Sequence, residues 1–172
     1  MSQDTEPSNI EDPRITLRTA QAEDVEVILE FIEGRAEFEA SGHQVEADAD
    51  QLRETLFGDC CFAEVTIAEY DGVPVGFVLY YHNYSTYLGK PGLRVEDIYV
   101  KPDFRGRGIA AKLFKNLANL AIDRGCGRFE FSVLDWNAPA ISFYEKLGAK
   151  AMDEWMVFRI NSQNLKKLVG AA

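Results

Sequence analysis

A strand, a glycine-rich loop and an amphipathic helix follow one another directly in residues 95–122. Residues 95–100 have the apolar character of a strand, and leucines recur at helical spacing in residues 111–122. Gly106 and Gly108 lie between them, where glycine permits backbone conformations that other residues avoid. The N–H groups of such a loop can converge on an anion at the positive end of the helix dipole. The sequence therefore predicts an α/β chain with a phosphate site where a strand turns into a helix.

We call residues 105–110 the glycine–arginine loop, because Arg105 and Arg107 alternate with its glycines. It is not a Walker loop, since no Gly-Lys-Ser/Thr closes it, and it lacks the Gly-x-Gly-x-x-Gly dinucleotide pattern. It reads instead as Arg-x-x-Gly-x-Ala. The spacing alone leaves open a turn that merely connects the strand to the helix.

The charge of the chain limits its partners. The 172 residues include 28 acidic and 18 basic side chains, for a formal net charge of -10. Nucleic-acid binding requires a basic face, so this balance argues against it. A negative surface can serve solubility alone, and it is equally compatible with a small cationic ligand.

The length and composition fit one globular domain, which we place at residues 14–172, after a disordered leader at residues 1–13. No apolar run approaches the roughly 20 residues that span a bilayer, so we expect no membrane partner. Three cysteines without metal-ligand spacing favour reduced thiols and a cytoplasmic location. Only two histidines are present, and we expect no metal site.

Periodicity and turn residues predict alternating strands and helices. The expected strands are residues 15–18, 62–70, 73–81, 93–100, 128–134 and 155–160. The expected helices run from about residue 20 to a stop at Gly34, and over residues 47–56, 111–122, 137–147 and 163–169. Residues 37–46 read as a loop or a broken helix, and residues 83–92 read as a loop. This order predicts one mixed α/β sheet with helices on its faces.

The motifs and their order over residues 15–160 resemble the GCN5-related N-acetyltransferase (GNAT) superfamily. Within it, the chain is similar to the spermidine/spermine (diamine) acetyltransferase and thialysine acetyltransferase group. The stretches that carry the resemblance are residues 80–81, 89–90, 96–100, 105–109, 133–137 and 143–149. The resemblance implies a GNAT fold, a mixed and mostly antiparallel central sheet with helices on both faces. It also implies a homodimer.

The resemblance implies acetyl-CoA as the acetyl donor and direct transfer in a ternary complex. A β-bulge near Asp97 would open a slot for the pantetheine arm. The implied cofactor-binding residues are Ile98, Tyr99, Val100, Arg105, Gly106, Arg107, Gly108, Ile109, Ala110, Asn137 and Tyr144.

An amine with a pKa near ~10 must lose a proton before it can attack a thioester. The resemblance places Glu96 as the proton acceptor, acting directly or through water, although Glu96 could instead only anchor the charge of the substrate. It places the Tyr144 hydroxyl near the sulfur as the proton donor, with a core tyrosine as the alternative. Asn137 is expected to cap the helix that carries Tyr144.

The resembling enzymes bind a cationic amine in an acidic, aromatic groove, because carboxylates and aromatic faces both attract ammonium groups. The corresponding residues here are Phe38, Glu39, Tyr87, Glu96, Asp97 and Trp155. For Glu39 and Asp97, ordinary solvated surface acids are the alternative.

The chain departs from the polyamine pattern in several places. Residues 85–87 replace an acid-Pro-aromatic run, Phe38 replaces a tyrosine, and the segment before Trp155 is short. Residues 85–86 and 133–137 lean toward the thialysine branch, whose substrate is a small amino acid. Its carboxylate would need a partner, for which Lys90, Arg94 and Arg107 are candidates.

The hypothesis is therefore an acetyl-CoA-dependent N-acetyltransferase for a primary amine of a polyamine, a diamine or a lysine-like amino acid. A protein or peptide N-acetyltransferase of the same fold is one alternative. A non-catalytic acyl-CoA-binding module is another, and the presence of both Glu96 and Tyr144 counts against it.

Overall fold

The computed structural model describes residues 12–170, which form two compact units. The first unit extends to Ser132 and the second begins at Val133. Residues 1–11 of the predicted leader lie outside the described residues. Asp12, which is described, accepts hydrogen bonds from the guanidinium and the amide of Arg14.

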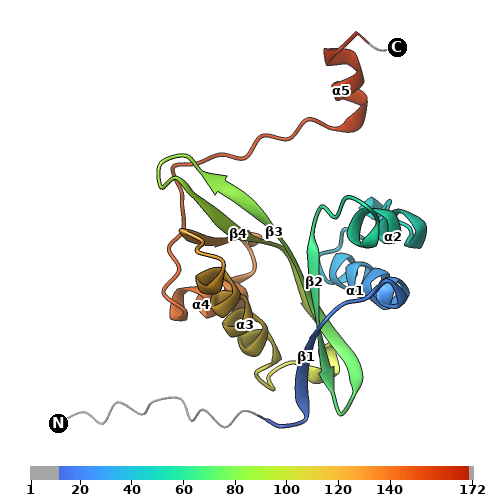
Figure 1. The fold of residues 1–172 in the computed structure, drawn as a ribbon, viewed down its shortest axis with the longest axis vertical. Helices are drawn as coiled ribbons and strands as arrows, with labels where there is room; N and C mark the ends of the chain where they lie inside the picture. Colours follow the sequence, from blue (N-terminus) through green and yellow to red (C-terminus); the bar gives the residue numbers. More distant parts are fainter. Residues whose placement is uncertain (1–11, 171–172) are drawn as a thin grey trace, which may run out of the picture. The chain divides into compact units, whose positions relative to one another are not determined.

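The first unit is built on a five-stranded sheet in the order β1-β2-β3-β4-β5. The strands are β1 (Ile15–Thr19), β2 (Glu64–Tyr70), β3 (Val73–Ser85), β4 (Lys90–Val100) and β5 (Arg128–Phe131). All neighbours pair antiparallel except β4 and β5, which are parallel (Figure 1). The prediction of a mixed, mostly antiparallel sheet is confirmed.

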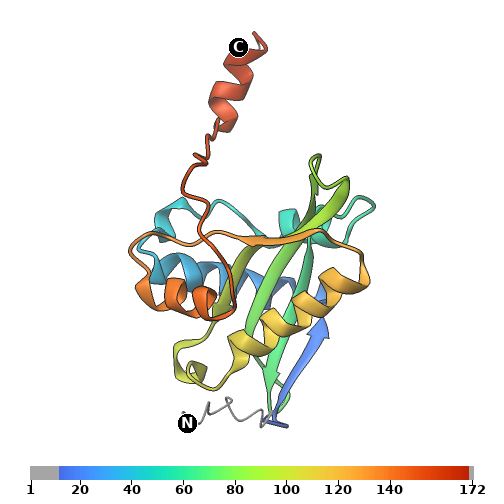
Figure 2. The ribbon, with the colours of Figure 1, turned by 90° about the vertical axis from the view of Figure 1, so that its left-hand side faces the viewer.

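Helices cover both faces of this sheet (Figures 1 and 2). Helices α1 (Val25–Phe38) and α2 (Ala49–Phe57) pack on one face, here called the α1 face, around Phe31 and Phe77. Helix α3 (Ile109–Asp123) packs on the other, here called the α3 face, through Leu113 and Leu117. Short 3-10 turns lie at Ala22–Asp24, Gly42–Gln44 and Pro102–Phe104.

The hairpins are longer than predicted. The turn at Asp71 and Gly72 is confirmed, with φ angles of 51° and 78° that suit a tight two-residue connection. The loop predicted over residues 83–92 is confined to residues 86–89, and the prediction is wrong at both ends, because β3 continues to Ser85 and β4 begins at Lys90. Backbone pairing between Asn83–Ser85 and Lys90–Gly92 extends the ladder through polar residues whose sequence resembles a loop.

The predicted helix stop at Gly34 is also wrong, since α1 continues to Phe38. A Cβ atom at Gly34 would lie 2.7 Å from the Tyr99 hydroxyl oxygen. The glycine therefore allows the helix to approach strand β4 closely rather than ending the helix. The helix ends four residues later, and Ala40 follows with a φ of 54°.

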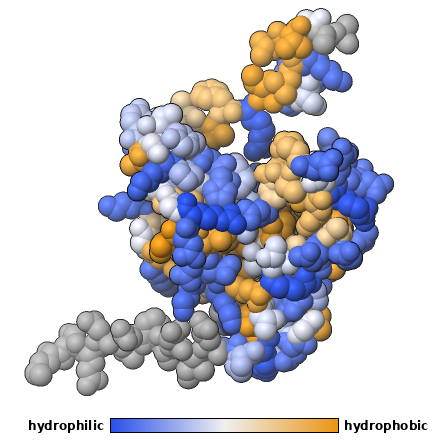
Figure 3. All heavy atoms as spheres, in the orientation of Figure 1, coloured by the Kyte–Doolittle hydropathy of each residue, from blue (hydrophilic) through white to orange (hydrophobic). Residues whose placement is uncertain are grey.

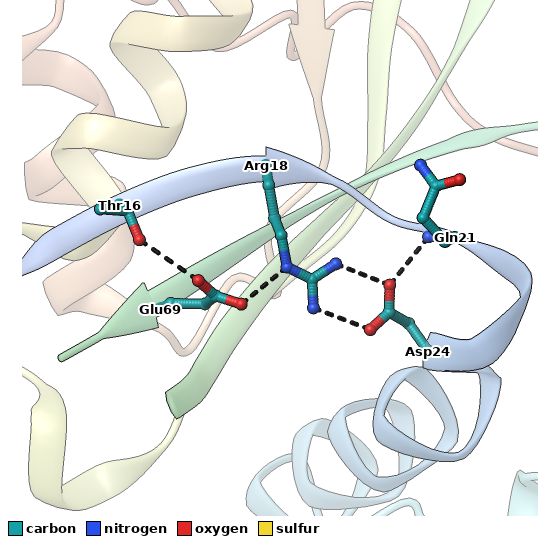
Figure 4. A network of polar contacts seen from close by, with 5 residues as sticks. All are labelled: Thr16, Arg18, Gln21, Asp24 and Glu69. Atoms are coloured by element: carbon teal, nitrogen blue, oxygen red, sulfur yellow. Dashed lines mark hydrogen bonds and ion pairs between the residues drawn. The ribbon is translucent and has the colours of Figure 1, made fainter. Parts of the chain in front are cut away.

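An ion-pair network fixes the connection from β1 to α1 (Figure 4). Arg18 pairs with Asp24 at 2.7 Å and with Glu69 at 2.6 Å. Asp24 also accepts a hydrogen bond from the Gln21 amide at 2.8 Å, and Thr16 donates to Glu69 at 3.3 Å. The start of α1 is thereby tied to strands β1 and β2, which orients the helix over the sheet.

The second unit contains helices α4 (Ala138–Lys146) and α5 (Ser162–Leu168). Two strand predictions near it fail: β5 ends at Phe131 rather than continuing to Leu134, and residues 155–160 form no strand. A strand needs a neighbour for its backbone groups, and alternation of side chains cannot supply one. Apolar side chains of the second unit remain exposed, Phe158 by 86% and Leu168 by 73%, and orange surface marks the C-terminal region in Figure 3.

Among the described residues, no helix is long and apolar enough to cross a membrane.

Candidate functional site

The central strand β4 contains a β-bulge at Glu96. Leu79 of β3 pairs with Asp97, and the next residue, Tyr80, pairs with Val95. Glu96 is therefore an extra residue without a partner across the ladder, and its side chain is exposed. The bulge predicted near Asp97 is confirmed.

The bulge reverses the faces to which the side chains of β4 point. Val95 packs in the core on the α3 face, and strict alternation would send Asp97 to the same face. The extra residue instead turns Asp97 toward the α1 face, where Arg35 of α1 meets it, and Tyr99 packs there against Phe31. The bulge thus brings an acid of the central strand to the helix that ends at Phe38.

Arg35 joins the two acids predicted to bind substrate. Its guanidinium lies 2.7 Å from an Asp97 carboxylate oxygen and 3.1 Å from a Glu39 carboxylate oxygen. Both acid side chains are only 17% exposed, so neither is an ordinary solvated surface acid. Arg35 is not among the residues predicted from the sequence, because a helix stop at Gly34 would leave both Arg35 and Glu39 outside the helix. With the helix continued, the i,i+4 spacing of Arg35 and Glu39 could have indicated the pair.

The electrostatics of Asp97 follow from this position. Burial raises the pKa of the Asp97 carboxyl above its ordinary value of 3.8, since the charged form is poorly solvated. The Arg35 guanidinium opposes that rise, while the neighbouring Glu96 and Glu39 reinforce it. The result is a concentrated patch of negative charge that one arginine partly balances.

The glycine–arginine loop follows the same strand and matches the requirements of an anion site. Gly106 and Gly108 have φ angles of 74° and 83°, and a Cβ atom at either would meet nothing within 4 Å. Gly108 is the N-cap of α3. Within the described part of the chain, the amides of residues 106–111 donate to no backbone carbonyl, so they remain available to phosphate oxygens.

The side chains of the two loop arginines are engaged with aromatic rings. The Arg105 guanidinium lies 4.7 Å from the Phe38 ring centre and 5.7 Å from that of Tyr99, and its Nε donates to the Val100 carbonyl at 2.9 Å. Arg107 lies 5.1 Å from the Tyr70 ring centre and donates to the Tyr70 hydroxyl at 3.2 Å. Arg105 therefore connects the loop to the end of α1, where Phe38 and Glu39 lie.

Strand β4 has an unpaired edge next to the loop. Strand β5 pairs with β4 only from Gly92 to Val95. Within the described residues, β4 has no strand neighbour on that side from Glu96 to Val100. Backbone groups around Ile98 are thus free to pair with an extended ligand. This is the edge at which the pantetheine arm is expected.

The remaining predicted residues are spread over both units. Tyr87 is 93% exposed in the turn before β4, and the strand from Lys90 to Glu96 alone spans roughly 20 Å at about 3.3 Å per residue. In the second unit, Asn137 caps α4 as predicted, its side-chain oxygen accepting from the Ala140 amide at 3.2 Å. Tyr144 lies on α4 with its ring centre 5.5 Å from that of Phe143. Trp155 is 67% exposed.

The described residues contain no group of three or more His, Cys, Asp or Glu side chains placed to hold a metal ion.

Comparison with known proteins places this arrangement in a family. The model of the acetyltransferase (GNAT) family matches residues 28–149. A thialysine N-epsilon-acetyltransferase from Sus scrofa is 38% identical over 167 residues, 91% of this chain and 98% of that protein. A spermidine/spermine N(1)-acetyltransferase-like protein from Homo sapiens is 34% identical over 159 residues, 87% of this chain and 23% of that protein.

A solved structure, an integron cassette protein from V. cholerae, superposes with a TM-score of 0.76 at 23% identity and covers 91% of this chain and 98% of its own. At that identity the likeness bears on the fold alone.

Replacing Arg35 should raise the pKa of Asp97 further. Arg35→Gln removes the positive charge that opposes the rise, while burial and the neighbouring acids remain. The pKa of Asp97 in the folded protein lies above its ordinary value of 3.8, so the protonated carboxyl stabilises the fold at low pH. This stabilisation is lost as the pH rises from 3.8 through the folded-state pKa, and in the variant the loss should extend to higher pH. Carbon-13 NMR titration of the Asp97 carboxyl in both proteins measures the shift.

Arg53→Gln is the matched control, since Arg53 pairs with Glu26 and Asp50 on the surface. The Arg53→Gln substitution should leave the pKa of the Asp97 carboxyl unchanged. A lower pKa in Arg35→Gln would contradict the electrostatic account.

Proposed function

Because the chain belongs to the GNAT family of acetyltransferases, we propose that it transfers an acetyl group from acetyl-CoA to the terminal primary amine of a small cationic acceptor. The acceptor is a diamine, a polyamine or a lysine-like amino acid. The single observation that carries this proposal is the pair of half-buried acids, Glu39 and Asp97, joined by Arg35 beside the bulge. Carboxylates at that position attract an ammonium group.

The first unit fits the expected cofactor. Free amides and left-handed glycines at residues 106–111 suit the pyrophosphate, and the unpaired edge of β4 around Ile98 suits an extended amide-bearing arm. Acetyl-CoA, when bound, supplies the acetyl group as a reactive thioester. The chain itself positions the amine and moves two protons.

Glu96 is the proposed proton acceptor. It is exposed at the bulge, next to the acids that would hold the ammonium group, and its carboxylate can take a proton from the amine directly or through water. Tyr144 is the proposed donor, its hydroxyl passing a proton to the departing sulfur. Asn137, which begins the helix of Tyr144, is proposed to contact the cofactor as well.

Two relatives support an acceptor of this kind. The protein from Sus scrofa is named for thialysine and the human protein for spermidine and spermine. All three compounds carry primary amines that are cationic at neutral pH. A peptide acceptor remains the alternative within the family. We also infer a homodimer, supported by the exposed apolar side chains of residues 155–160 and of α5.

Turnover of acetyl-CoA across a panel of amines tests the proposal. The panel contains spermidine, putrescine, L-ornithine, L-lysine, thialysine and a peptide with a free N-terminus, and thiol release is the readout. We expect turnover with one or more of the small amines because the acids at the bulge attract cations. Turnover with the peptide alone would contradict a small-amine acceptor and indicate a protein or peptide acceptor instead. Tight CoA binding without any turnover would favour a non-catalytic binding module.

Substitution of Glu96 by Gln should reduce kcat/KM by roughly 100-fold or more near neutral pH. The difference in kcat/KM between the variant and the wild type should become smaller as the pH approaches the pKa of the amine, because substrate that is already unprotonated needs no base. The pH profile of kcat/KM measures this, with Glu33→Gln, an exposed acid on α1, as control. An unchanged pH profile with a raised KM would assign Glu96 to charge anchoring instead.

Substitution of Tyr144 by Phe should lower kcat by roughly 100-fold while leaving the Kd for CoA nearly unchanged, because only the hydroxyl proton is removed. Steady-state kinetics and calorimetric titration with CoA measure the two quantities. Tyr84→Phe, which removes a hydroxyl from a 62% exposed residue, should change neither. Full turnover in Tyr144→Phe would exclude the tyrosine as the proton donor.

A further inference from the structure

Arg94 lies on the proposed acceptor side of the sheet, close to the bulge. Its neighbours in β4, Leu93 and Val95, both pack in the core on the α3 face. Because side chains alternate along a strand, Arg94 points to the α1 face, the face that Asp97 reaches through the bulge. The guanidinium and the acid patch thus share one surface of β4.

The hydrogen-bond partner of Arg94 is a neutral side chain. Its Nη2 donates to the Ser132 hydroxyl at 2.7 Å. Within the described residues no carboxylate forms an ion pair with it, whereas Arg18 and Arg35 each pair with two carboxylates and Arg128 pairs with one.

The acid in register with Arg94 on β5 is Glu130, and it is engaged elsewhere. Glu130 lies 2.9 Å from Arg128 Nε and accepts a hydrogen bond from Asn83 at 2.6 Å. Arg94 is therefore a half-buried cation whose N–H groups can accommodate a carboxylate from outside the chain.

The spacing along β4 matches the length of a lysine-like substrate. Arg94 lies two residues before Glu96, which is about 7 Å along a strand. In lysine and thialysine, the terminal amine and the carboxyl carbon are separated by the same number of bonds as two residues of extended backbone. The extended substrate therefore also spans about 7 Å between these two groups. An amine held at Glu96 and Asp97 would therefore place its carboxylate near Arg94.

We propose that Arg94, supported by Ser132, binds the α-carboxylate of the acceptor, which makes the acceptor a lysine-like amino acid rather than a diamine. A guanidinium can bind a carboxylate through two parallel hydrogen bonds, which fixes both position and orientation. The proposal rests on the proposed acetyltransferase function and adds the substrate class to it.

The other two cations considered for this role are placed less well. Lys90 is exposed at the start of β4, roughly 20 Å from Glu96 at about 3.3 Å per residue. Arg107 lies over the rings of Tyr70 and Phe104 and donates to the Tyr70 hydroxyl. Arg94 alone of the three combines the right face with the right distance.

The test compares substrates that differ only by the carboxylate: L-lysine with cadaverine, and L-ornithine with putrescine. The wild-type protein should have the higher kcat/KM for the amino acid in each pair. Arg94→Gln should lower kcat/KM for the amino acids by about 10- to 100-fold, the range for a lost hydrogen-bonded charge pair. For the diamines it should be unchanged or higher, because a like charge near a dication has been removed.

Two further variants sharpen the result. Arg94→Lys should recover only part of the preference, since an ammonium group cannot bind a carboxylate in the two-pronged manner of a guanidinium. Lys90→Gln removes the other cation of β4 and should leave the preference unchanged. Calorimetric titration of L-lysine in the presence of CoA provides a readout besides turnover. Its Kd should rise at least about tenfold in Arg94→Gln, in line with the loss of a charged hydrogen bond.

Each outcome decides the proposal. A wild-type preference for diamines, or a preference for amino acids that survives in Arg94→Gln, would overturn the role of Arg94 and leave the acetyltransferase function intact. Loss of the preference in Lys90→Gln would move the role to Lys90. Acetylation of none of the four amines would overturn this inference, and it would refute the proposed function only if spermidine and thialysine were not acetylated either. Matching thermal unfolding curves would show that Arg94→Gln is folded.

Discussion

Strand β4 contains one residue more than strand β3 can pair with, and the position of that residue determines how the rest of the site is arranged. Glu96 stands outside the ladder, and every side chain beyond it is turned to the opposite face. Asp97 therefore meets Arg35 on α1, and Tyr99 packs beneath the same helix against Phe31. Beyond Val95, β4 also loses its neighbour β5, which leaves backbone groups free along one edge.

Arginine side chains connect the parts of the first unit that would bind the two substrates. Arg35 links the central strand to the end of α1, and Arg105 links the glycine–arginine loop to the same place through the Phe38 ring. Half-buried ion pairs contribute little net stability because removing charges from water is costly. Their value in this molecule is positional, since they hold acids together that would otherwise repel one another beside the bulge.

The two binding surfaces use different kinds of groups. The glycine–arginine loop presents backbone amides at the start of α3, and its arginine side chains are turned toward Phe38 and Tyr70. Such a surface recognises phosphate through geometry that glycine permits. The proposed acceptor side uses side-chain charge instead, with acids at the bulge and Arg94 two residues before it. We expect substitutions there to change the acceptor without altering the proposed cofactor site.

The sequence by itself determined the order of most strands and helices, the glycine–arginine loop and the identity of the acids at the bulge. These are local properties: side-chain periodicity defines elements, and Gly106 and Gly108 mark a loop whose conformation few other residues allow. Tertiary structure decided what depends on a partner. Gly34 lies within a helix that packs closely on Tyr99. Residues 83–85 pair with residues 90–92 because two strands meet, and residues 155–160 have strand-like alternation but no neighbouring strand. The pairing of Arg35 with Asp97 could not be predicted for the same reason, since a salt bridge between a helix and a distant strand exists only once the bulge has turned the acid to the helix face.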